Sequence, residues 1–169
     1  MSNATLLELA PLQLEREEHE HWRTGAVAKR WARQYPNVFD ADDLRLALVR
    51  CAQGRHYFEW AAARHLHRAT GFNALVCKYE FAKHRSKGAI VERLFTPTVT
   101  RVLRDRQTHG RAQAPDLLMY APDLSSFFFC EVKGPSDRIR ADQLQRFDAL
   151  ARVTRQPVHI LRIQWAIPR

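Results

Sequence analysis

Hydrophobic residues in the first half of the chain recur every three or four positions, which is the spacing of one face of a helix. This pattern predicts a helical stretch over 5–34 and a short helix that Asp40 or Asp42 caps. It also predicts a helix from Tyr57 to Thr70 that ends before Gly71. The first half of the chain is therefore expected to be helical.

The second half of the chain alternates between strand-like and helical patterns. Strands are expected over 75–81, 117–120, 127–133 and 158–163. Helices are expected around 90–95, from Thr96-Pro97 onward, and from Ser136 or Asp137 to Val153. A hairpin followed by a helix and a further strand fits a mixed sheet with helices on its faces. We therefore expect an α/β fold, with 1–53 as a helical extension and 54–169 as the main domain.

The composition suits a globular protein. A chain of 169 residues, 46% of them hydrophobic, can bury one core and is not expected to be disordered. No segment approaches the roughly 20 apolar residues that a membrane helix needs, and the N-terminus shows no signal-peptide pattern. We therefore expect no membrane partner and a cytoplasmic location. Cys51, Cys77 and Cys130 lie far apart without CxxC spacing, so reduced, buried thiols are expected.

The charge is large and unevenly distributed. The net charge of the chain is +9, yet residues 1–20 carry −4, which leaves +13 on the rest of the chain. A basic excess of this size suggests a polyanionic partner, and nucleic acid comes first, because each phosphate contact releases counterions. Charge alone indicates only the class of partner.

The strand over 127–133 contains the main chemical clue. Side chains of a strand alternate between its faces, so Phe129, Glu131 and Lys133 share one face, while Cys130 and Val132 lie on the other. Both faces are mostly apolar, so this strand is expected to be central and covered on both sides. A glutamate and a lysine at the end of a covered strand are costly unless they are paired or coordinated. The simple alternative is an ion pair where the strand reaches the surface.

Asp116 favours a metal site over that alternative. It follows Pro115 directly before the neighbouring strand, where a hairpin would bring its carboxylate beside Glu131. Two carboxylates and the main-chain carbonyl of Val132 would form an oxygen-lined site for Mg²⁺ or Mn²⁺. Lys133 can hold an attacking water and stabilise the charge that develops on a phosphate. The alternative for Pro115-Asp116 is a turn-forming pair, which is common.

These residues carry a resemblance to a known family. Pro115-Asp116 and Glu131-Val132-Lys133 match the short PD-(D/E)xK nuclease motif. The longer run from Glu131 to Gln143 (EVKGPSDRIRADQ) resembles the VRR-NUC family, the nuclease module also found at the C-terminus of Fanconi-associated nucleases. The longer run is specific. The chain departs from the family at Arg146, where family members usually carry a tryptophan, and we expect this to alter local packing while the metal site survives.

The resemblance implies a restriction-endonuclease-like core with a mixed central sheet. It also implies that Glu59 supplies a further carboxylate near the metal, although a partner for a buried Arg or Lys is the alternative. Gln143 faces the core side of its helix, where it would orient Lys133 or the attacking water, or would be a satisfied half-buried amide. Stand-alone family members tend to be dimeric, whereas forms with helical additions can be monomeric. A homodimer and a monomer both stay open.

Several basic and histidine residues are weaker candidates. Lys83, Arg85 and Lys87 form a basic segment that is expected to contact the phosphate backbone, or else to be a solvated surface run, and Arg111 would extend that surface. Arg138 is expected near the scissile phosphate. The pairs His19 and His21, and His65 and His67, suggest zinc, but residues two apart on a helix point to different sides, so no zinc site is expected there.

The sequence thus predicts a metal-dependent nuclease that hydrolyses DNA phosphodiester bonds. Asp116, Glu131, Glu59 and the Val132 carbonyl would bind the metal, and Lys133 and Gln143 would complete the catalytic site. Branched or flap DNA, of the kind met in repair or recombination, is the expected substrate. An antibacterial DNA-degrading toxin, a phage-type nuclease and a non-catalytic DNA-binding module that keeps the fold are the alternatives. The same chemistry would also serve on RNA.

Overall fold

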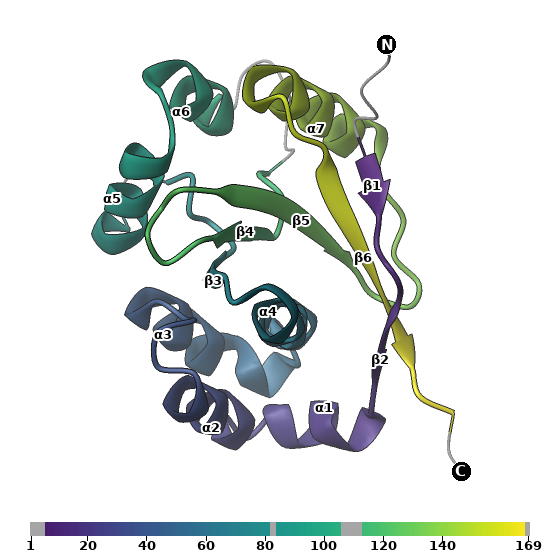
Figure 1. Cartoon of the computed structure of the whole chain (residues 1–169). Helices are drawn as coiled ribbons and strands as arrows, with labels where there is room; N and C mark the ends of the chain where they lie inside the picture. Colours follow the sequence, from purple (N-terminus) through teal and green to yellow (C-terminus); the bar gives the residue numbers. More distant parts are fainter. Residues whose placement is uncertain (1–5, 82–83, 106–112, 168–169) are drawn as a thin grey trace.

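A mixed β-sheet runs through the centre of the molecule (Figure 1). The structure, a computed structural model, describes residues 6–81, 84–105 and 113–167. Within these residues the sheet has six strands in the order β1-β6-β5-β4-β3, and β2 also pairs with β6. The pairs β3–β4 and β4–β5 are antiparallel, whereas β5–β6, β1–β6 and β2–β6 are parallel. The strands are β1 Leu6–Glu8, β2 Leu12–Leu14, β3 Asn73–Val76, β4 Leu117–Tyr120, β5 Phe127–Lys133 and β6 Val158–Trp165.

Helices cover both faces of the sheet (Figure 1). One face carries α1 Arg16–Trp22, α2 Ala26–Gln34, α3 Ala41–Arg50 and α4 Tyr57–Thr70, with a short 3-10 helix over Cys51–Gln53. The other face carries α5 Arg85–Leu94, α6 Pro97–Arg104 and α7 Ala141–Thr154. None of the described helices is both long and apolar enough to cross a membrane. The predicted α/β fold, a mixed sheet between helices with a helical N-terminal part, is confirmed.

The alternation predicted for β5 divides the core into two halves. Cys130 and Val132 pack into the half under α1 to α4, together with buried aromatic residues such as Trp31 and Trp60. Phe129 points the other way, into the half under α5 to α7. Because each face of β5 is covered, the strand is central and ends among buried groups, as the sequence predicts.

Two helix starts follow the predicted signals. Asp40, rather than Asp42, caps α3, because its Oδ1 accepts a hydrogen bond of 2.8 Å from the backbone N–H of Asp42. Thr96 caps α6 in the same way through Val99, and Pro97 occupies the first turn.

The prediction that residues 5–34 are helical throughout is wrong at its start. Residues Leu6–Glu8 and Leu12–Leu14 form β1 and β2, which pair with successive parts of β6. Leu6 lies opposite Val158, and Leu12 lies opposite Ile163. Without this pairing, β6 would be an edge strand whose outer backbone N–H and C=O groups lack partners. The strands β1 and β2 provide those partners. The boundary between 1–53 and 54–169 stays a prediction.

The strand predicted over 75–81 is shifted and shorter. It runs from Asn73 to Val76, and the next two residues, Cys77 and Lys78, adopt left-handed conformations with φ of 52° and 54°. A strand cannot continue through two such residues, so the chain turns away toward α5.

The helix predicted from Ser136 or Asp137 begins later, at Ala141. The carboxylate of Asp137 accepts a hydrogen bond of 3.1 Å from the backbone N–H of Gly134, which holds the segment before α7 as a loop. Such local side-chain bonds compete with helix formation.

Candidate active site

The ends of β4 and β5 bring two carboxylates together. Leu117 lies opposite Cys130 in the antiparallel pair, so Asp116 stands beside Glu131. The backbone N–H of Asp116 donates to Glu131 Oε2 at 3.2 Å, and the backbone N–H of Val132 donates to Asp116 Oδ2 at 3.0 Å. These two reciprocal bonds fix both carboxylates at the strand ends, as the hairpin argument predicts.

Lys133, Glu131 and Gln143 form a closed triangle of polar contacts. Lys133 Nζ lies 2.7 Å from Glu131 Oε1 and donates to Gln143 Oε1 at 3.0 Å. Gln143 Nε2 donates to the same Glu131 oxygen at 2.7 Å. The three residues are 3–8% exposed, so these contacts form with little water to compete. The Gln143 amide therefore fixes the direction of the lysine ammonium.

The start of α7 explains why Gln143 reaches the strand. Gln143 is the third residue of the helix, and its Oε1 also accepts a hydrogen bond of 3.2 Å from the backbone N–H of Arg140 at the N-cap. One side-chain oxygen thus serves both the helix start and the lysine.

A cavity of about 320 Å³ opens between these elements. Glu59 lines the cavity from α4, which covers the face of the sheet opposite to α7. The cavity is lined by every side chain predicted for the chemistry, together with Val132: Glu59, Asp116, Glu131, Val132, Lys133 and Gln143. Asp137 and Arg140 line it as well, which the sequence argument missed.

The acidic groups of the cavity perturb one another. Burial raises the pKa of Asp116 well above its usual range, and the nearby Glu131 and Glu59 raise it further. Burial likewise raises the pKa of Glu59, with smaller contributions from Glu131 and Asp137. Carboxylates that repel one another in a buried site are stabilised as anions by a bound cation. Carboxylate and carbonyl oxygens are the donors that Mg²⁺ and Mn²⁺ prefer, so the residues present fit such an ion.

A second set of contacts holds the segment before β4. The hydroxyl of Tyr79 donates to the Pro115 carbonyl at 2.7 Å, and the backbone N–H of Cys77 donates to the Asp116 carbonyl at 2.7 Å. Tyr79 is fully buried. The position of Asp116 therefore depends on the unusual turn after β3, and no local motif in the sequence indicates this.

The predicted DNA-binding residues differ in exposure and in their position relative to the cavity. Arg138 is exposed in the loop before α7 but does not line the cavity, where Arg140 stands instead. Arg85 is exposed at the start of α5. Lys83 and Arg111 lie outside the described residues.

The prediction for Lys87 is wrong. Its side chain is fully buried, forms an ion pair with Asp43, and donates at 3.0 Å to the carbonyls of Val76 and Cys77. A buried ammonium with these partners cannot contact a DNA phosphate from this position. Arg85 and Lys87 lie in the first turn of α5, where helical geometry turns Lys87 inward while Arg85 stays outside.

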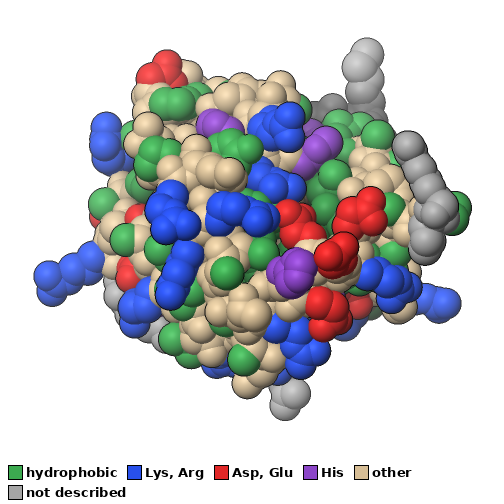
Figure 2. Space-filling view, turned by 90° about the horizontal axis from the view of Figure 1, so that it is seen from below, with side chains coloured by type: hydrophobic (Ala, Val, Ile, Leu, Met, Phe, Trp, Pro, Cys, Tyr) green, Lys and Arg blue, Asp and Glu red, His purple; other side chains and the backbone are tan. Residues whose placement is uncertain are grey.

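Other basic residues lie near the cavity. The pKa of His56, at the N-cap of α4, is lowered to about 4 by burial and by the positive charges of nearby basic side chains. Three of the basic side chains that lower this pKa, Lys78, Arg50 and Arg55, are half-buried or exposed. His56 is three residues before Glu59, so this positive charge lies close to the acidic cavity. Figure 2 shows Lys and Arg side chains gathered on one face of the molecule, beside a smaller group of Asp and Glu side chains.

Local packing accounts for several histidine and cysteine side chains outside the cavity. His19 stacks on Phe58 and lies 3.3 Å from the Gly54 carbonyl, while His67 lies 2.8 Å from the Phe72 carbonyl. Among the described residues, no three-ligand group contains either histidine pair. The described cysteines are free thiols; Cys51 and Cys130 are buried, but Cys77 is partly exposed.

Arg146 stands where the motif resemblance leads us to expect a tryptophan. The side chain is 1% exposed, and its guanidinium donates to the carbonyls of Leu103 and Asp105 at the end of α6. A cation at a helix C-terminus is favourable, because the last carbonyls there have no helical partners. This replacement links α7 to α6 and leaves Gln143 in the cavity.

Gly134 is closely packed. A Cβ at this position would lie 3.0 Å from Asp137 Oδ2 and 3.1 Å from a ring carbon of Phe58. We expect Gly134→Ala to lower the free energy of unfolding by about 1–3 kcal/mol, measured by urea denaturation. Gly88→Ala is the matched control, because an added Cβ there meets nothing within 4 Å and the residue lies in a helix. Equal stability of both variants would contradict the packing argument.

A mixed sheet between helices presents an Asp, a Glu and a Lys at the ends of two adjacent strands, an arrangement that agrees with the nuclease motif in the sequence. The chain belongs to the VRR-NUC domain family, since that family matches residues 57–163, which is more than half of the chain. The match confirms the resemblance that the motif residues carry.

Solved structures give a more distant likeness. One is paFAN1 bound to DNA with a two-nucleotide 5′ flap and a gap, at a TM-score of 0.45 and 18% identity, covering 99% of this chain and 39% of that chain. Another is paFAN1 bound to DNA with a one-nucleotide 5′ flap and a gap, at a TM-score of 0.42, with the same identity and coverage. This chain thus spans 39% of the length of those proteins. The comparison with curated proteins gives no match.

Proposed function

We propose that this protein is a nuclease that hydrolyses DNA phosphodiester bonds with Mg²⁺ or Mn²⁺. The observation that carries the proposal is one cavity lined by Asp116, Glu131 and Glu59 together with Lys133, whose ammonium contacts Glu131. Membership of the VRR-NUC family supports it. The resemblance favours branched or flap DNA as the substrate.

In this proposal the acidic residues hold the metal. The carboxylates of Asp116, Glu131 and Glu59 and the carbonyl of Val132 would be its ligands. Such an ion polarises the phosphate and neutralises the charge that develops on it. The reciprocal hydrogen bonds between the two strand ends keep Asp116 and Glu131 in place before substrate arrives, so little reorganisation is needed.

Lys133 would act on the attacking water. Its ammonium donates a hydrogen bond to the water oxygen and places a positive charge beside the phosphate. Gln143 is a positioning residue, because it contacts Lys133 and Glu131 and thereby sets the direction in which the ammonium points. Arg140 lines the cavity and would contact the scissile phosphate or its neighbour, a role that sequence reasoning gives to Arg138.

A cleavage assay tests this function. The protein is incubated with linear duplex, flap, fork, four-way junction and single-stranded DNA, with Mg²⁺, Mn²⁺ or a chelator. We expect cleavage that requires metal and is fastest on a branched substrate. An Asp116→Asn preparation, purified in parallel, controls for contaminating nuclease. Binding of DNA without cleavage under every condition would instead indicate a non-catalytic DNA-binding module.

A further inference from the structure

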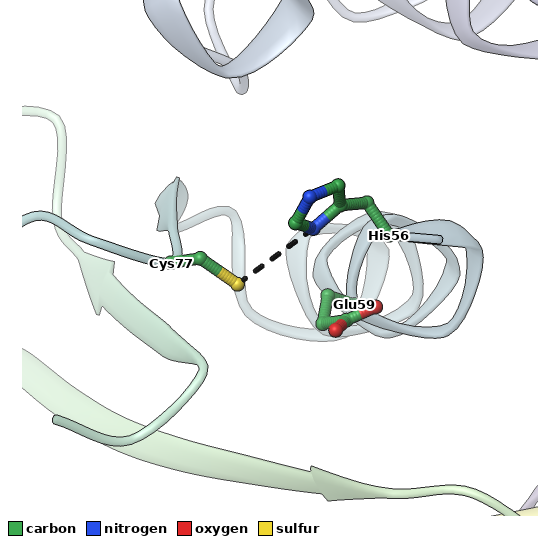
Figure 3. Close-up of side chains that lie close together, drawn as sticks. All are labelled: His56, Glu59 and Cys77. Atoms are coloured by element: carbon green, nitrogen blue, oxygen red, sulfur yellow. Dashed lines mark hydrogen bonds between the residues drawn. The ribbon is translucent and has the colours of Figure 1, made fainter. Parts of the chain in front are cut away.

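A second cluster of metal-ligand side chains lies beside the acidic cavity (Figure 3). Among the described residues, His56, Glu59 and Cys77 are the one group of three whose ligand atoms all lie within 4.8 Å of one another. Cys77 points from the turn after β3 toward His56, and Glu59 lies one turn further along α4 (Figure 3). Cys77 Sγ is 4.0 Å from His56 Nδ1.

The backbone at this cluster is in an uncommon conformation. His56 has a φ of 69°, Cys77 a φ of 52°, and the next residue, Lys78, a φ of 54°. Left-handed conformations are uncommon for residues other than glycine, and they collect at functional sites. His56 also makes no capping hydrogen bond to α4, although it stands at the N-cap. The strained residues are therefore those that turn the imidazole and the thiol toward each other.

We propose that His56, Glu59 and Cys77 form a site for a zinc-type divalent ion, distinct from the Mg²⁺ or Mn²⁺ site. One nitrogen, one sulfur and one oxygen donor suit Zn²⁺, whereas Mg²⁺ prefers oxygen alone. With zinc bonds of about 2.0–2.3 Å, tetrahedral ligand atoms lie roughly 3.3–3.8 Å apart. From separations of up to 4.8 Å the ligand atoms therefore need to approach one another by at most roughly 1.5 Å, which side-chain rotation can supply. The thiol loses its proton on binding, and a water completes the fourth position.

Glu59 belongs to both sites, and this couples them. It lines the acidic cavity and is also one of the three ligands of the second cluster. Glu59 offers two carboxylate oxygens on one short side chain, and rotation toward His56 and Cys77 draws it from the cavity. A zinc-type ion at the second site therefore lowers Mg²⁺-dependent cleavage, a consequence that rests on the proposed nuclease function.

Cobalt spectroscopy tests the site without any use of nuclease activity. The full chain is reduced and titrated with Co²⁺, which takes zinc sites and gives a thiolate-to-cobalt charge-transfer band in the near ultraviolet. We expect one equivalent of Co²⁺ to give the band in wild type, and Zn²⁺ to bleach it. Cys77→Ser should lose the band, whereas the matched variants Cys51→Ser and Cys130→Ser should keep it.

A second variant tests the site independently, in case Cys77→Ser does not fold. His56→Asn removes the imidazole at a left-handed position that asparagine tolerates well. We expect it to weaken Co²⁺ binding at least tenfold, while its circular dichroism spectrum matches wild type. Absence of the band in wild type, or a band in Cys77→Ser as strong as in wild type, would overturn the site.

A cleavage assay then separates the site from its coupling to catalysis. Zn²⁺ added to the Mg²⁺-dependent reaction should inhibit wild type at a concentration at least tenfold lower than it inhibits Cys77→Ser. Equal inhibition of both proteins, together with the cobalt band in wild type, would leave the site standing and reject the coupling through Glu59. Absence of cleavage without Zn²⁺ would instead reject the proposed function, since the cobalt result does not depend on it.

Discussion

Lys133→Met is expected to lower the rate of DNA cleavage by about 10²- to 10³-fold, the usual loss when one preorganised charge-stabilising donor is removed. Methionine keeps an unbranched chain of similar length but removes the ammonium that contacts Glu131 and Gln143. DNA affinity should change little, because Lys133 lines the cavity with only 5% of its surface exposed. Single-turnover cleavage and fluorescence anisotropy measure the two quantities separately.

Arg152→Met provides the control for loss of one positive charge. Arg152 lies on the same helix as Gln143, its side chain is 78% exposed, and it pairs only at the surface with Asp148. This variant should cleave at the wild-type rate. Urea denaturation of both variants shows whether loss of the buried contact has unfolded Lys133→Met. A folded Lys133→Met protein that cleaves as fast as wild type would reject the proposed role of the lysine.

The acidic and basic centre of the site is predictable from sequence because it depends on short-range rules. Side-chain alternation assigns Glu131 and Lys133 to one face of β5, and a hairpin of short span brings Asp116 beside them. Helical spacing assigns Gln143 to the inner face of α7. Each of these inferences involves neighbours along the chain or a single tight connection. Glu59 is implied only by the family resemblance, because it lies on α4, more than fifty residues before Asp116 in the chain.

The rest of the surroundings depends on contacts between distant segments. The pairing of β1 and β2 with β6 cannot be read from a leucine-rich N-terminus that also fits a helix. The second metal-ligand cluster joins His56 to Cys77 through two left-handed turns, and no sequence spacing indicates it. Basic residues look alike in sequence, so only the structure shows that Arg140 lines the cavity while Lys87 is buried.

The burial of Lys87 predicts the largest loss of stability. Lys87 and Asp43 form an ion pair with no exposed side-chain surface, which joins α5 to α3 and, through the carbonyls of Val76 and Cys77, to the turn after β3. Lys87→Met leaves the Asp43 carboxylate buried without its cation. We expect this to lower the free energy of unfolding by about 3–5 kcal/mol, measured by urea denaturation.

The loss should grow with pH. Burial raises the pKa of Asp43 to about 7, and the attraction of Lys87 opposes that rise. Without Lys87 the folded-state pKa is higher still, while the unfolded value is unchanged. Between the unfolded and folded pKa values the native state binds the extra proton, so its stability falls as pH rises. Lys87→Met should therefore be closer to wild type at pH 5 than at pH 8.

Replacing both partners separates the charge from the packing. In Asp43→Asn/Lys87→Met no buried charge remains, and the asparagine amide oxygen can still accept the hydrogen bond of 3.0 Å that Val76 N–H donates to Asp43. The double variant should lose less unfolding free energy than the two single variants lose in sum. The difference should be roughly 1–3 kcal/mol. Its stability should also lose the pH dependence of Lys87→Met. Strictly additive losses, with the pH dependence retained, would show that Asp43 is not the group that Lys87 neutralises.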